Sequence, residues 1–390
     1  GNKMAKDKMN IPQIRFKGFE GEWERDVLKK IAKINPTSNL PDKFKYIDLE
    51  SVKGSSLIDY RIEYKNKAPS RAQRVAEKGD IFYQTVRPYQ KNNYLFELFE
   101  KNYVFSTGYA QIRPLKNITS KFLFSLIQSE KFVNKVLVRC TGTSYPAINS
   151  TELSLIDVRY PLLKEQTQIG DFFQKIDQVI ELQQKALDTA RAYKQSMLQK
   201  MFPQKGEKVP RVRFAGFSGD WIIKNIGSLV SPVKREVSKP DSPYYRLSIR
   251  SHARGTFQRL VEDPKQVAMD KLYIVKDGDL VVNITFAWEH AIAIAKKEDD
   301  GTLVSHRFPT YIIDKMNADF LGVLIAQKKF KYQLNLISPG GAGRNRVMNQ
   351  KDFLRIKILL PKLDEQTAIG NFFQKLDQQI EQQAQKLATY

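Results

Sequence analysis

Apolar and polar positions follow a helical period over residues 165–202 of this 390-residue chain. Apolar side chains recur there every three or four residues, and no Gly or Pro interrupts the stretch from Asp171 to Phe202, a pattern typical of an amphipathic helix. Pro203 cannot continue a helix and so predicts its end. At ~1.5 Å per residue the helix is roughly 57 Å long, and its seam has the heptad spacing of a coiled coil.

The same helix is written twice in the chain. Residues 165–190 and 365–390 are identical at 16 of 26 positions. Residues 12–23 match residues 210–221 at seven of 12 positions, with nearly the same offset. A nearly constant offset indicates one unit of ~200 residues that has been duplicated.

Between the repeated segments, residues 24–160 and 222–360 share a pattern but little sequence. Each stretch contains a strand that begins at a Gly-Asp pair (Gly79-Asp80 and Gly278-Asp279) and ends in one helix followed by a polar, Gly-containing loop. The expected strands are short and rich in aromatic or β-branched residues: 44–49, 80–86 and 109–113 in the first stretch, and 244–249, 279–286, 291–295 and 310–313 in the second. The expected helices run from a Thr119 cap to about 138 and from 317 to about 336, and the loops are 139–149 and 338–349.

These patterns predict an α+β protein with two α/β domains in a pseudo-two-fold arrangement, separated by two long helices. Two amphipathic helices in one chain most simply pack on each other, and a two-fold relation makes that pairing an antiparallel coiled coil. We expect domains at 1–160, with an N-terminal segment at 1–22, and at 204–360. The helices occupy 161–203 and 361–390, the second being shorter than the first because nothing in it corresponds to 191–203.

The net charge of the chain indicates what kind of partner it binds, not which fold it has. The chain has 64 Lys and Arg against 42 Asp and Glu, a formal net charge of +22, which favours an anionic partner such as nucleic acid over a merely basic protein. A hydrophobic share of 42% excludes wholesale disorder. No apolar run approaches the ~20 residues of a membrane helix, and none near the start reads as a signal peptide. Cys140, the single cysteine, excludes a disulfide framework. We therefore expect a cytoplasmic protein.

Two motifs, each present twice, resemble one family. They are Arg-Phe-x-Gly-Phe-x-Gly-x-Trp (Arg15–Trp23 and Arg213–Trp221) and Pro-x-Leu-x-Glu-Gln-x-x-Ile-Gly (Pro161–Gly170 and Pro361–Gly370). Together they resemble the DNA-specificity subunit of type I restriction–modification enzymes, over nearly the whole chain. The resemblance implies two target recognition domains, each reading one half of a bipartite sequence in double-stranded DNA, and helices that dock two modification subunits.

The resemblance also implies where the chemistry resides. Modification subunits of that family bind S-adenosylmethionine and methylate adenine, and restriction subunits add ATP-driven translocation and cleavage. S-adenosylmethionine, ATP and Mg²⁺ are therefore expected on partner subunits, with no cofactor on this chain and no membrane partner.

The residues themselves contain no recognisable catalytic centre. The chain has no Gly-Lys dipeptide and hence no phosphate-binding loop of the Gly-x-x-x-x-Gly-Lys type. It has no Asn/Asp-Pro-Pro-aromatic methyltransferase motif. Its three histidines, His252, His290 and His306, lack metal-ligand spacing. We predict a non-catalytic subunit without catalytic or metal-binding residues.

Two alternatives stay open at this point. Asp42 followed by Glu63 and Lys65 mimics the carboxylate–carboxylate–lysine set of metal-dependent nucleases. The equivalent set in the second half contains Pro264, which disfavours a central strand. The other alternative is a structural coiled-coil or RNA-binding protein.

Major-groove readout favours Arg or Lys on guanine and Asn or Gln on adenine. We therefore place candidate DNA-binding residues after the Gly-Asp strands, in the Gly loops and, in the second domain, near an early strand that also carries Arg246. They are Gln84, Arg87, Lys91, Asn92, Arg139, Thr141, Thr143, Tyr145, Arg250, His252, Arg254, Asn283, Trp288, Arg344, Asn345 and Arg346. Arg344–Arg346 is the strongest candidate, because neighbouring glycines allow close backbone approach.

The repeated helices carry the candidate partner-docking residues, since the same apolar face is written twice. These residues are Phe172, Phe173, Ile176, Ile180, Phe372, Phe373, Leu376 and Ile380.

Overall fold

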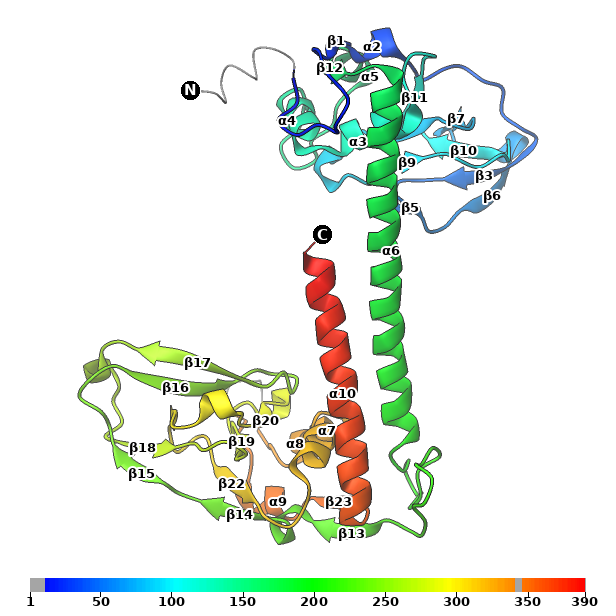
Figure 1. Cartoon of the computed structure of the whole chain (residues 1–390). Coiled ribbons are helices and arrows are strands. Elements are labelled where there is room, and N and C mark those ends of the chain that lie inside the picture. Colours follow the sequence, from blue (N-terminus) through cyan, green and yellow to red (C-terminus); the bar gives the residue numbers. More distant parts are fainter. Residues whose placement is uncertain (1–10, 341–345, 390) are drawn as a thin grey trace. The chain divides into compact units, whose positions relative to one another are not determined.

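The computed structural model describes residues 11–340 and 346–389. The chain divides into two compact units, with the boundary between Glu181 and Leu182. That boundary lies inside the long helix α6 (Leu163–Lys200), so each unit contains one end of it (Figure 1). The predicted helix end is confirmed, because α6 stops three residues before Pro203.

The first unit contains two four-stranded sheets, a two-stranded sheet and a small hairpin. One large sheet has the order β2 (Ala32–Ile34), β11 (Tyr109–Pro114), β8 (Ile81–Gln84), β9 (Tyr94–Leu95). The other has the order β6 (Arg61–Tyr64), β3 (Lys43–Ile47), β10 (Tyr103–Ser106), β7 (Ala72–Val75). The small pairs are β1 (Glu24–Val27) with β12 (Asp157–Tyr160) and β4 (Val52–Lys53) with β5 (Ser56–Leu57). The helices are α2 (Leu28–Ile31), η1 (Lys65–Lys67), η2 (Pro88–Gln90), α3 (Ser120–Gln128), α4 (Glu130–Val138) and α5 (Ser150–Ser154).

The second unit repeats both sheet orders and adds one edge strand. Its first sheet is β14 (Val230–Val233), β22 (Thr310–Ile313), β19 (Leu280–Val282), β20 (Ile292–Ile294). Its second is β15 (Glu236–Ser238), β18 (Lys271–Ile274), β21 (Leu303–Val304), β16 (Tyr244–Ile249), β17 (Thr256–Val261). The pair is β13 (Ile222–Asn225) with β23 (Lys357–Leu360). The helices are η3 (Ile226–Ser228), η4 (Pro264–Gln266), η5 (Ala287–Glu289), η6 (Lys297–Asp299), α7 (Ala318–Ile325), α8 (Lys328–Leu336), α9 (Gln350–Leu354) and α10 (Leu363–Ala388).

The equivalent elements also pair in the same sense. Strand β10 runs parallel to β3 and antiparallel to β7, and β21 likewise runs parallel to β16 and antiparallel to β18. The hairpins β3–β6 and β16–β17 therefore occupy the same place in the two units. The duplication predicted from the repeat extends through the variable stretches, although their sequences differ.

The single helix predicted in each variable stretch is wrong, because the chain breaks it into two. Ser129 is extended (ψ 143°), and its hydroxyl accepts a hydrogen bond from the backbone N–H of Phe132 as the N-cap of α4. Gln327 is extended in the same way (ψ 147°) between α7 and α8. Thr119 precedes α3 as predicted, but its side chain makes no capping hydrogen bond.

The strand predicted at 279–286 is also too long. It ends as β19 at Val282, because the side-chain oxygen of Asn283 accepts hydrogen bonds from the backbone N–H and hydroxyl of Thr285 and turns the chain.

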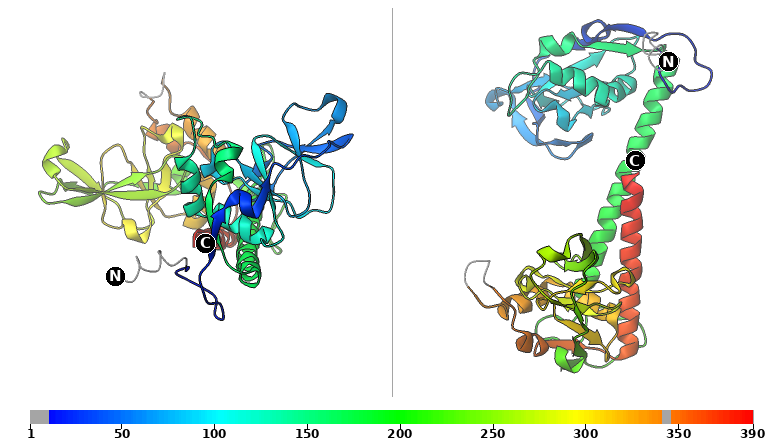
Figure 2. Two further views of the ribbon diagram at one scale, coloured as in Figure 1. Left: turned by 90° about the horizontal axis from the view of Figure 1, so that it is seen from above. Right: turned by 90° about the vertical axis from the view of Figure 1, so that its left-hand side faces the viewer.

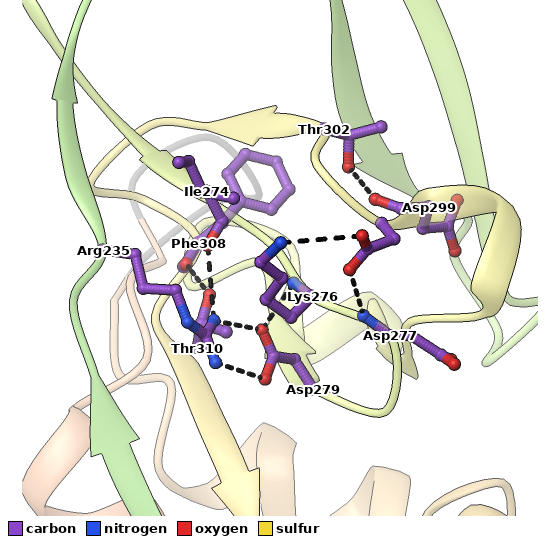
Figure 3. A network of polar contacts seen from close by, with 10 residues as sticks. Arg235, Ile274, Lys276, Asp277, Asp279, Asp299, Thr302, Phe308 and Thr310 are labelled. Carbon is purple, nitrogen blue, oxygen red and sulfur yellow. Dashed lines mark hydrogen bonds and ion pairs between the residues drawn. The ribbon is translucent and has the colours of Figure 1, made fainter.

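The buried aspartate of each Gly-Asp pair anchors the strand that follows it. Asp80 forms a bidentate ion pair with Arg113 of β11, at 2.7 and 2.8 Å. Asp279 is bound instead by Arg235, at 2.6 and 3.1 Å (Figure 3). Each carboxylate also accepts a hydrogen bond from a backbone N–H three residues earlier, at 2.8 Å. The two units thus satisfy the same buried charge with arginines from different elements.

The two repeated motifs meet each other and fix each domain on its own helix. Arg15 donates two hydrogen bonds to the buried carboxylate of Glu165 at 2.8 and 2.7 Å, and a third to the carbonyl of Gly21. Arg213 binds Glu365 in the same way, with both distances 2.7 Å. Planar, bidentate pairing of this kind fixes orientation as well as distance.

Two further residues of the helix-start motif complete this attachment. The side-chain oxygen of Gln166 accepts from the backbone N–H of Thr119, and Gln366 accepts from Asn317, both at 2.9 Å. A Cβ at Gly170 would lie 2.8 Å from the backbone nitrogen of Phe122, which leaves room only for glycine where α6 crosses the start of α3.

Within the second unit, α10 packs along the C-terminal part of α6 (Figures 1 and 2). Lys194 forms an ion pair with Asp377. Phe202, about two turns further along, contacts Phe373, about one turn earlier on α10, with ring centroids 6.3 Å apart. The residue numbers of the contacting side chains decrease along α10 as they increase along α6 and just beyond it. The packing is therefore antiparallel, as predicted.

Candidate DNA interface

In the first unit, the loop after β8 holds two residues in left-handed backbone conformations. Arg87 (φ 52°) and Lys91 (φ 53°) flank the short helix η2. Such values are uncommon for residues other than glycine and cluster at functional sites. Gln84, the last residue of β8, holds this loop by two hydrogen bonds. Its side-chain amide donates to the side chain of Gln90 and accepts from the backbone N–H of Asn92.

The Gly loop joins this strained loop, so that both present one surface. The backbone N–H of Arg87 donates to the carbonyl of Pro146 at 2.7 Å, and Ile148 donates to Thr85 at 3.0 Å. The guanidinium of Arg87 stacks on the ring of Tyr145, 4.2 Å from its centroid. Tyr145 is 64% exposed, whereas Nε of Arg87 is buried and has no hydrogen-bond partner in the described part of the chain.

The second unit makes the same junction with the two residue types exchanged. The aromatic residue, Trp288, now follows the Gly-Asp strand, and the cation, Arg346, comes from the Gly loop, 5.3 Å from the indole ring. The backbone N–H of Met348 donates to the carbonyl of Ile284 at 2.8 Å and joins the two loops. The indole N–H of Trp288 donates to the carbonyl of Thr285. Each unit therefore presents one Arg–aromatic stack at the junction of equivalent loops.

Arg346, predicted to bind DNA, uses its guanidinium for hydrogen bonds within the protein. Its guanidinium donates to the carbonyl of Ser338 at 2.9 Å and to that of Asn335 at 3.0 Å, at the end of α8. Such carbonyls lack helical partners and favour a cation. Arg344 and Asn345, the other two members of the strongest candidate group, lie outside the described residues.

A third segment joins the interface of the second unit. In the turn between β16 and β17, His252 (φ 64°) and Ala253 (φ 52°) have left-handed backbones. Their backbone N–H groups donate to the carbonyls of Glu289 and His290, both at 2.8 Å. These bonds hold the turn against the residues that follow Trp288 in the chain, and Arg250, His252 and Arg254 of this segment are exposed.

The remaining candidates are spread over the same loops with different neighbours. Lys91 forms an ion pair with Glu130, and Arg139 forms one with Glu152 at 3.3 Å. The side chain of Asn92 accepts a hydrogen bond from Gly54. Thr141 and Thr143 are exposed. Asn283 is buried and forms the turn described above.

The docking candidates separate by burial. Phe373 and Leu376 belong to the hydrophobic core of the second unit, whereas Phe172 and Phe173 are each 45% exposed. Ile176, Ile180, Phe372 and Ile380 are half-buried.

Sequence reasoning missed Phe257 and Arg259 on β17. Arg250 and Arg259 both stack on the ring of Phe257, at 4.9 and 5.1 Å from its centroid. The alternation Phe257, Arg259 on a strand was the available signal, since residues two apart share a face.

His290 is the buried histidine of this region. Its Nε2 lies 2.6 Å from the carbonyl oxygen of Ile325. Burial lowers the pKa of His290 below its usual range, despite the opposing effect of that hydrogen bond.

Neither metal nor membrane chemistry is indicated in the described part of the chain. Residues 11–340 and 346–389 contain no group of three or more His, Cys, Asp and Glu side chains arranged to hold a metal ion. Among these same residues, no helix combines the length and apolar character that crossing a bilayer requires.

Comparison with known proteins identifies the family. The model of the type I restriction modification DNA specificity domain matches residues 23–190 and again residues 231–389. The chain therefore belongs to the type I restriction–modification specificity subunit family, which is non-catalytic and generally binds no cofactor.

Individual relatives and structures agree in family and fold. The HindI specificity subunit of Haemophilus influenzae is 28% identical over 173 residues, 43% of this chain and 35% of that protein. The chain spans 35%, 64% and 63% of the length of three curated relatives that it matches. The S subunit of a type I system from M. genitalium has the same fold at 12% identity, with a TM-score of 0.56, covering 97% of this chain and 95% of that one. A chain from a structure on complex assembly and conformational transition of the type I R-M system matches at 19% identity and a TM-score of 0.54, covering 97% and 96%.

Proposed function

We propose that this specificity subunit reads a bipartite sequence in double-stranded DNA, with residues 1–160 recognising one half and residues 204–360 the other. In this proposal the helices 161–203 and 361–390 position two modification subunits and, through them, restriction subunits. The chain itself transfers no methyl group and holds neither S-adenosylmethionine nor ATP and Mg²⁺.

The observation that carries the proposal is the repeated loop junction. Equivalent loops meet on equivalent sheets, but the side chains that they present differ. Arg87 and Tyr145 in one unit stand where Trp288 and Arg346 stand in the other. Because base edges are read by side-chain identity, unlike residues on like scaffolds are suited to two unlike half-sites.

The electrostatics support DNA as the partner. A net charge of +22 supplies the sequence-independent attraction to phosphates. Arginine is the residue most often found on guanine O6 and N7. Arg87 lies at the junction of the two loops, with its guanidinium stacked on the exposed ring of Tyr145, so this residue is a candidate reader of the first half-site.

Methylome sequencing of cells that express the chain with its cognate modification subunit tests the proposal. We expect methylated adenines in one bipartite motif with a fixed spacer. Exchanging residues 24–160 for those of another family member should change one half of the motif only. Methylation by the purified chain alone, or a change in both halves, would contradict the proposal.

A matched pair of point variants tests the role of the loop junction. Arg87→Ala should relax the base preference at one position of the first half-site, at a cost of about 1–3 kcal/mol in discrimination. Arg25→Ala, on β1 of the same unit and paired with Asp157, is the control and should leave the motif unchanged. Equal effects of the two substitutions would remove the argument for Arg87.

A further inference from the structure

The hairpin β16–β17 of the second unit carries an uncompensated positive charge. Residues 244–261 contain Arg246, Arg250, Arg254 and Arg259 and no Asp or Glu. Residues 43–64, the equivalent β3–β6 hairpin with its connection, contain four Lys and Arg and four Asp and Glu. The same structural element is therefore strongly basic in one unit and neutral in the other.

Two of these arginines oppose each other directly. Arg246 and Arg259 are cross-strand partners in the β16–β17 register. Like charges in this position destabilise a strand pair, so an anion bound between or above them would relieve the repulsion. Leu247 and Ile249 are buried in the core, and strand alternation places Arg246 on the opposite face of the hairpin.

The basic face is held in place near the turn of the hairpin. The hydroxyl of Thr256 donates to the carboxylate of Asp299 at 2.6 Å, and Gln258 donates to the carbonyl of Glu298 at 2.6 Å. Asp299 is 1% exposed, and its own carbonyl accepts from Thr302 (Figure 3). The guanidinium groups of Arg250 and Arg259 approach Phe257 within 4.9 and 5.1 Å. This anchoring lowers the entropic cost of presenting the arginines to a ligand.

The hairpin continues directly from the candidate DNA interface. Its turn is bonded to Glu289 and His290 beside Trp288. The Arg246–Arg259 pair lies three residue pairs away from the turn end, Ile249–Thr256, a distance of ~10 Å at ~3.4 Å per residue. On a duplex this corresponds to roughly three base-pair steps of ~3.4 Å. In Figure 1 the hairpin lies on the side of the second unit away from α10.

We propose that the Arg246–Arg259 face binds the phosphate backbone of double-stranded DNA just outside the half-site read by the second domain, and that the first domain has no equivalent contact. This inference rests on the proposed function. It assigns to one hairpin a sequence-independent share of DNA affinity, whereas the loops around Trp288 read bases.

The equivalent hairpin of the first unit is engaged differently. Lys45 forms an ion pair with Glu100 at 2.6 Å, and Arg61 pairs with Asp48 at 3.6 Å. Its edge strand β6 exposes Ile62 and Tyr64, each by about half, as does Tyr60 just before the strand. Because Lys45 and Arg61 already have carboxylate partners, this surface gains less from binding phosphate than the β16–β17 hairpin does.

The test is the salt dependence of DNA binding by the full chain assembled with its modification subunits. The double variant Arg246→Gln and Arg259→Gln should lower the slope of log K against log salt by about 2, because each phosphate contact contributes ~0.9. Affinity should fall roughly tenfold at physiological salt for cognate and random duplexes alike. The methylated motif should stay unchanged.

Two control variants isolate the proposed contact. Lys45→Gln with Arg61→Gln changes the same charge on the equivalent hairpin and should leave the slope unchanged. Arg246→Lys with Arg259→Lys keeps the charge and should restore the slope. The thermal unfolding midpoint of the glutamine variant should equal or exceed that of the parent, since the like-charge contact is removed.

Trimming the duplex sharpens the test further. Removing the base pairs that flank the second half-site should weaken DNA binding by the parent complex and leave binding by the Arg246→Gln, Arg259→Gln variant unaffected. Removing the base pairs that flank the first half-site should not change DNA binding by the glutamine variant of either hairpin. An unchanged salt slope in the glutamine variant, or an altered methylation motif, would overturn the inference. A parent complex that binds cognate and random duplexes equally would instead overturn the proposed function.

Discussion

One pair of phenylalanines occurs in both repeated helices, in surroundings that differ between the two units. Phe373 is fully buried, whereas Phe173, its counterpart in the first unit, is 45% exposed. Phe373 is covered by Met201, Phe202 and Trp221, which belong to one hydrophobic cluster with it. The burial of Phe373 therefore depends on residues outside its own helix, α10.

The equivalent hairpins β3–β6 and β16–β17 differ between the units in sequence. Here the position in the fold is the same, and the sequence decides the chemistry. The β16–β17 hairpin contains no Asp or Glu of its own, whereas in the β3–β6 region Lys45 pairs with Glu100 and Arg61 with Asp48. Duplication has preserved the scaffold, and substitution on its surface has made the two units different.

The largest expected difference between the units concerns the phenylalanine pair. Phe373→Ala should cost about 3–5 kcal/mol in unfolding free energy, because it leaves a cavity in a packed aromatic cluster. Phe173→Ala should cost less than about 1 kcal/mol, since the side chain is already half in water. Urea unfolding followed by hydrogen exchange in peptides of each unit measures both. Equal costs would mean that Phe173 is covered as well as Phe373.

The Gly-Asp anchors should behave alike in spite of their different arginines. Asp80→Asn and Asp279→Asn each leave an arginine without its buried partner. We expect a loss of about 2–3 kcal/mol, less than for a fully buried pair, because Arg113 and Arg235 are about a quarter exposed. The same urea experiment applies. A loss in one unit only would show that the anchor is not shared.

The crossing glycines sharpen the same comparison at smaller magnitude. A Cβ at Gly170 would meet the backbone of α3 at 2.8 Å, and one at Gly370 would meet Asp319 at 2.8 Å. Gly170→Ala and Gly370→Ala should each destabilise their own unit by about 1–3 kcal/mol, by overpacking. Hydrogen exchange at the start of α3 and α7 should rise in the matching variant. Unchanged exchange would place the helices further apart than described.

The smallest predicted difference depends on pH. The chain's three histidines, at 252, 290 and 306, all lie in the second unit. Because burial holds the pKa of His290 below that of the unfolded chain, the unfolded state binds its proton first as pH falls. The second unit should therefore lose stability below about pH 6.5, by up to ~1.4 kcal/mol per pH unit.

A substitution isolates this histidine. His290→Gln keeps a donor for the carbonyl of Ile325 and removes the titrating group, so the slope should flatten. Urea midpoints of the parent and the variant between pH 7.5 and 5.5 provide the measurement. If stability depended on pH as steeply in the variant as in the parent, or more steeply, the pH effect would belong to other groups.

Local sequence patterns predicted the elements that depend on neighbours along the chain. The end of α6 before Pro203 and the strands at 109–113 and 244–249 are of this kind. The breaks at Ser129 and Gln327 were missed because each depends on one capping or extended residue within an otherwise continuous apolar period. The period alone does not distinguish one helix from two.

The candidate site was predictable as a set of loops but not as an arrangement. Glycines, arginines and amides marked the loops that follow the Gly-Asp strands and the helices, and the structure shows that these loops meet in each unit. The stacking of Arg87 on Tyr145 joins residues far apart in sequence, and no local period reports such a contact. Arg346 appeared free in the sequence, whereas the carbonyls at the end of α8 accept hydrogen bonds from its guanidinium.

The central claim is that each variable stretch reads its own half-site from a shared scaffold. Replacing residues 24–160 with a second copy of residues 222–360 tests it most directly, because Trp23 and Pro161 align with Trp221 and Pro361 at the junctions. Methylome sequencing of cells that express this chimera with the modification subunit should reveal a motif whose two halves contain the same bases, those of the parent's second half-site. A motif that keeps two unlike halves would contradict the claim.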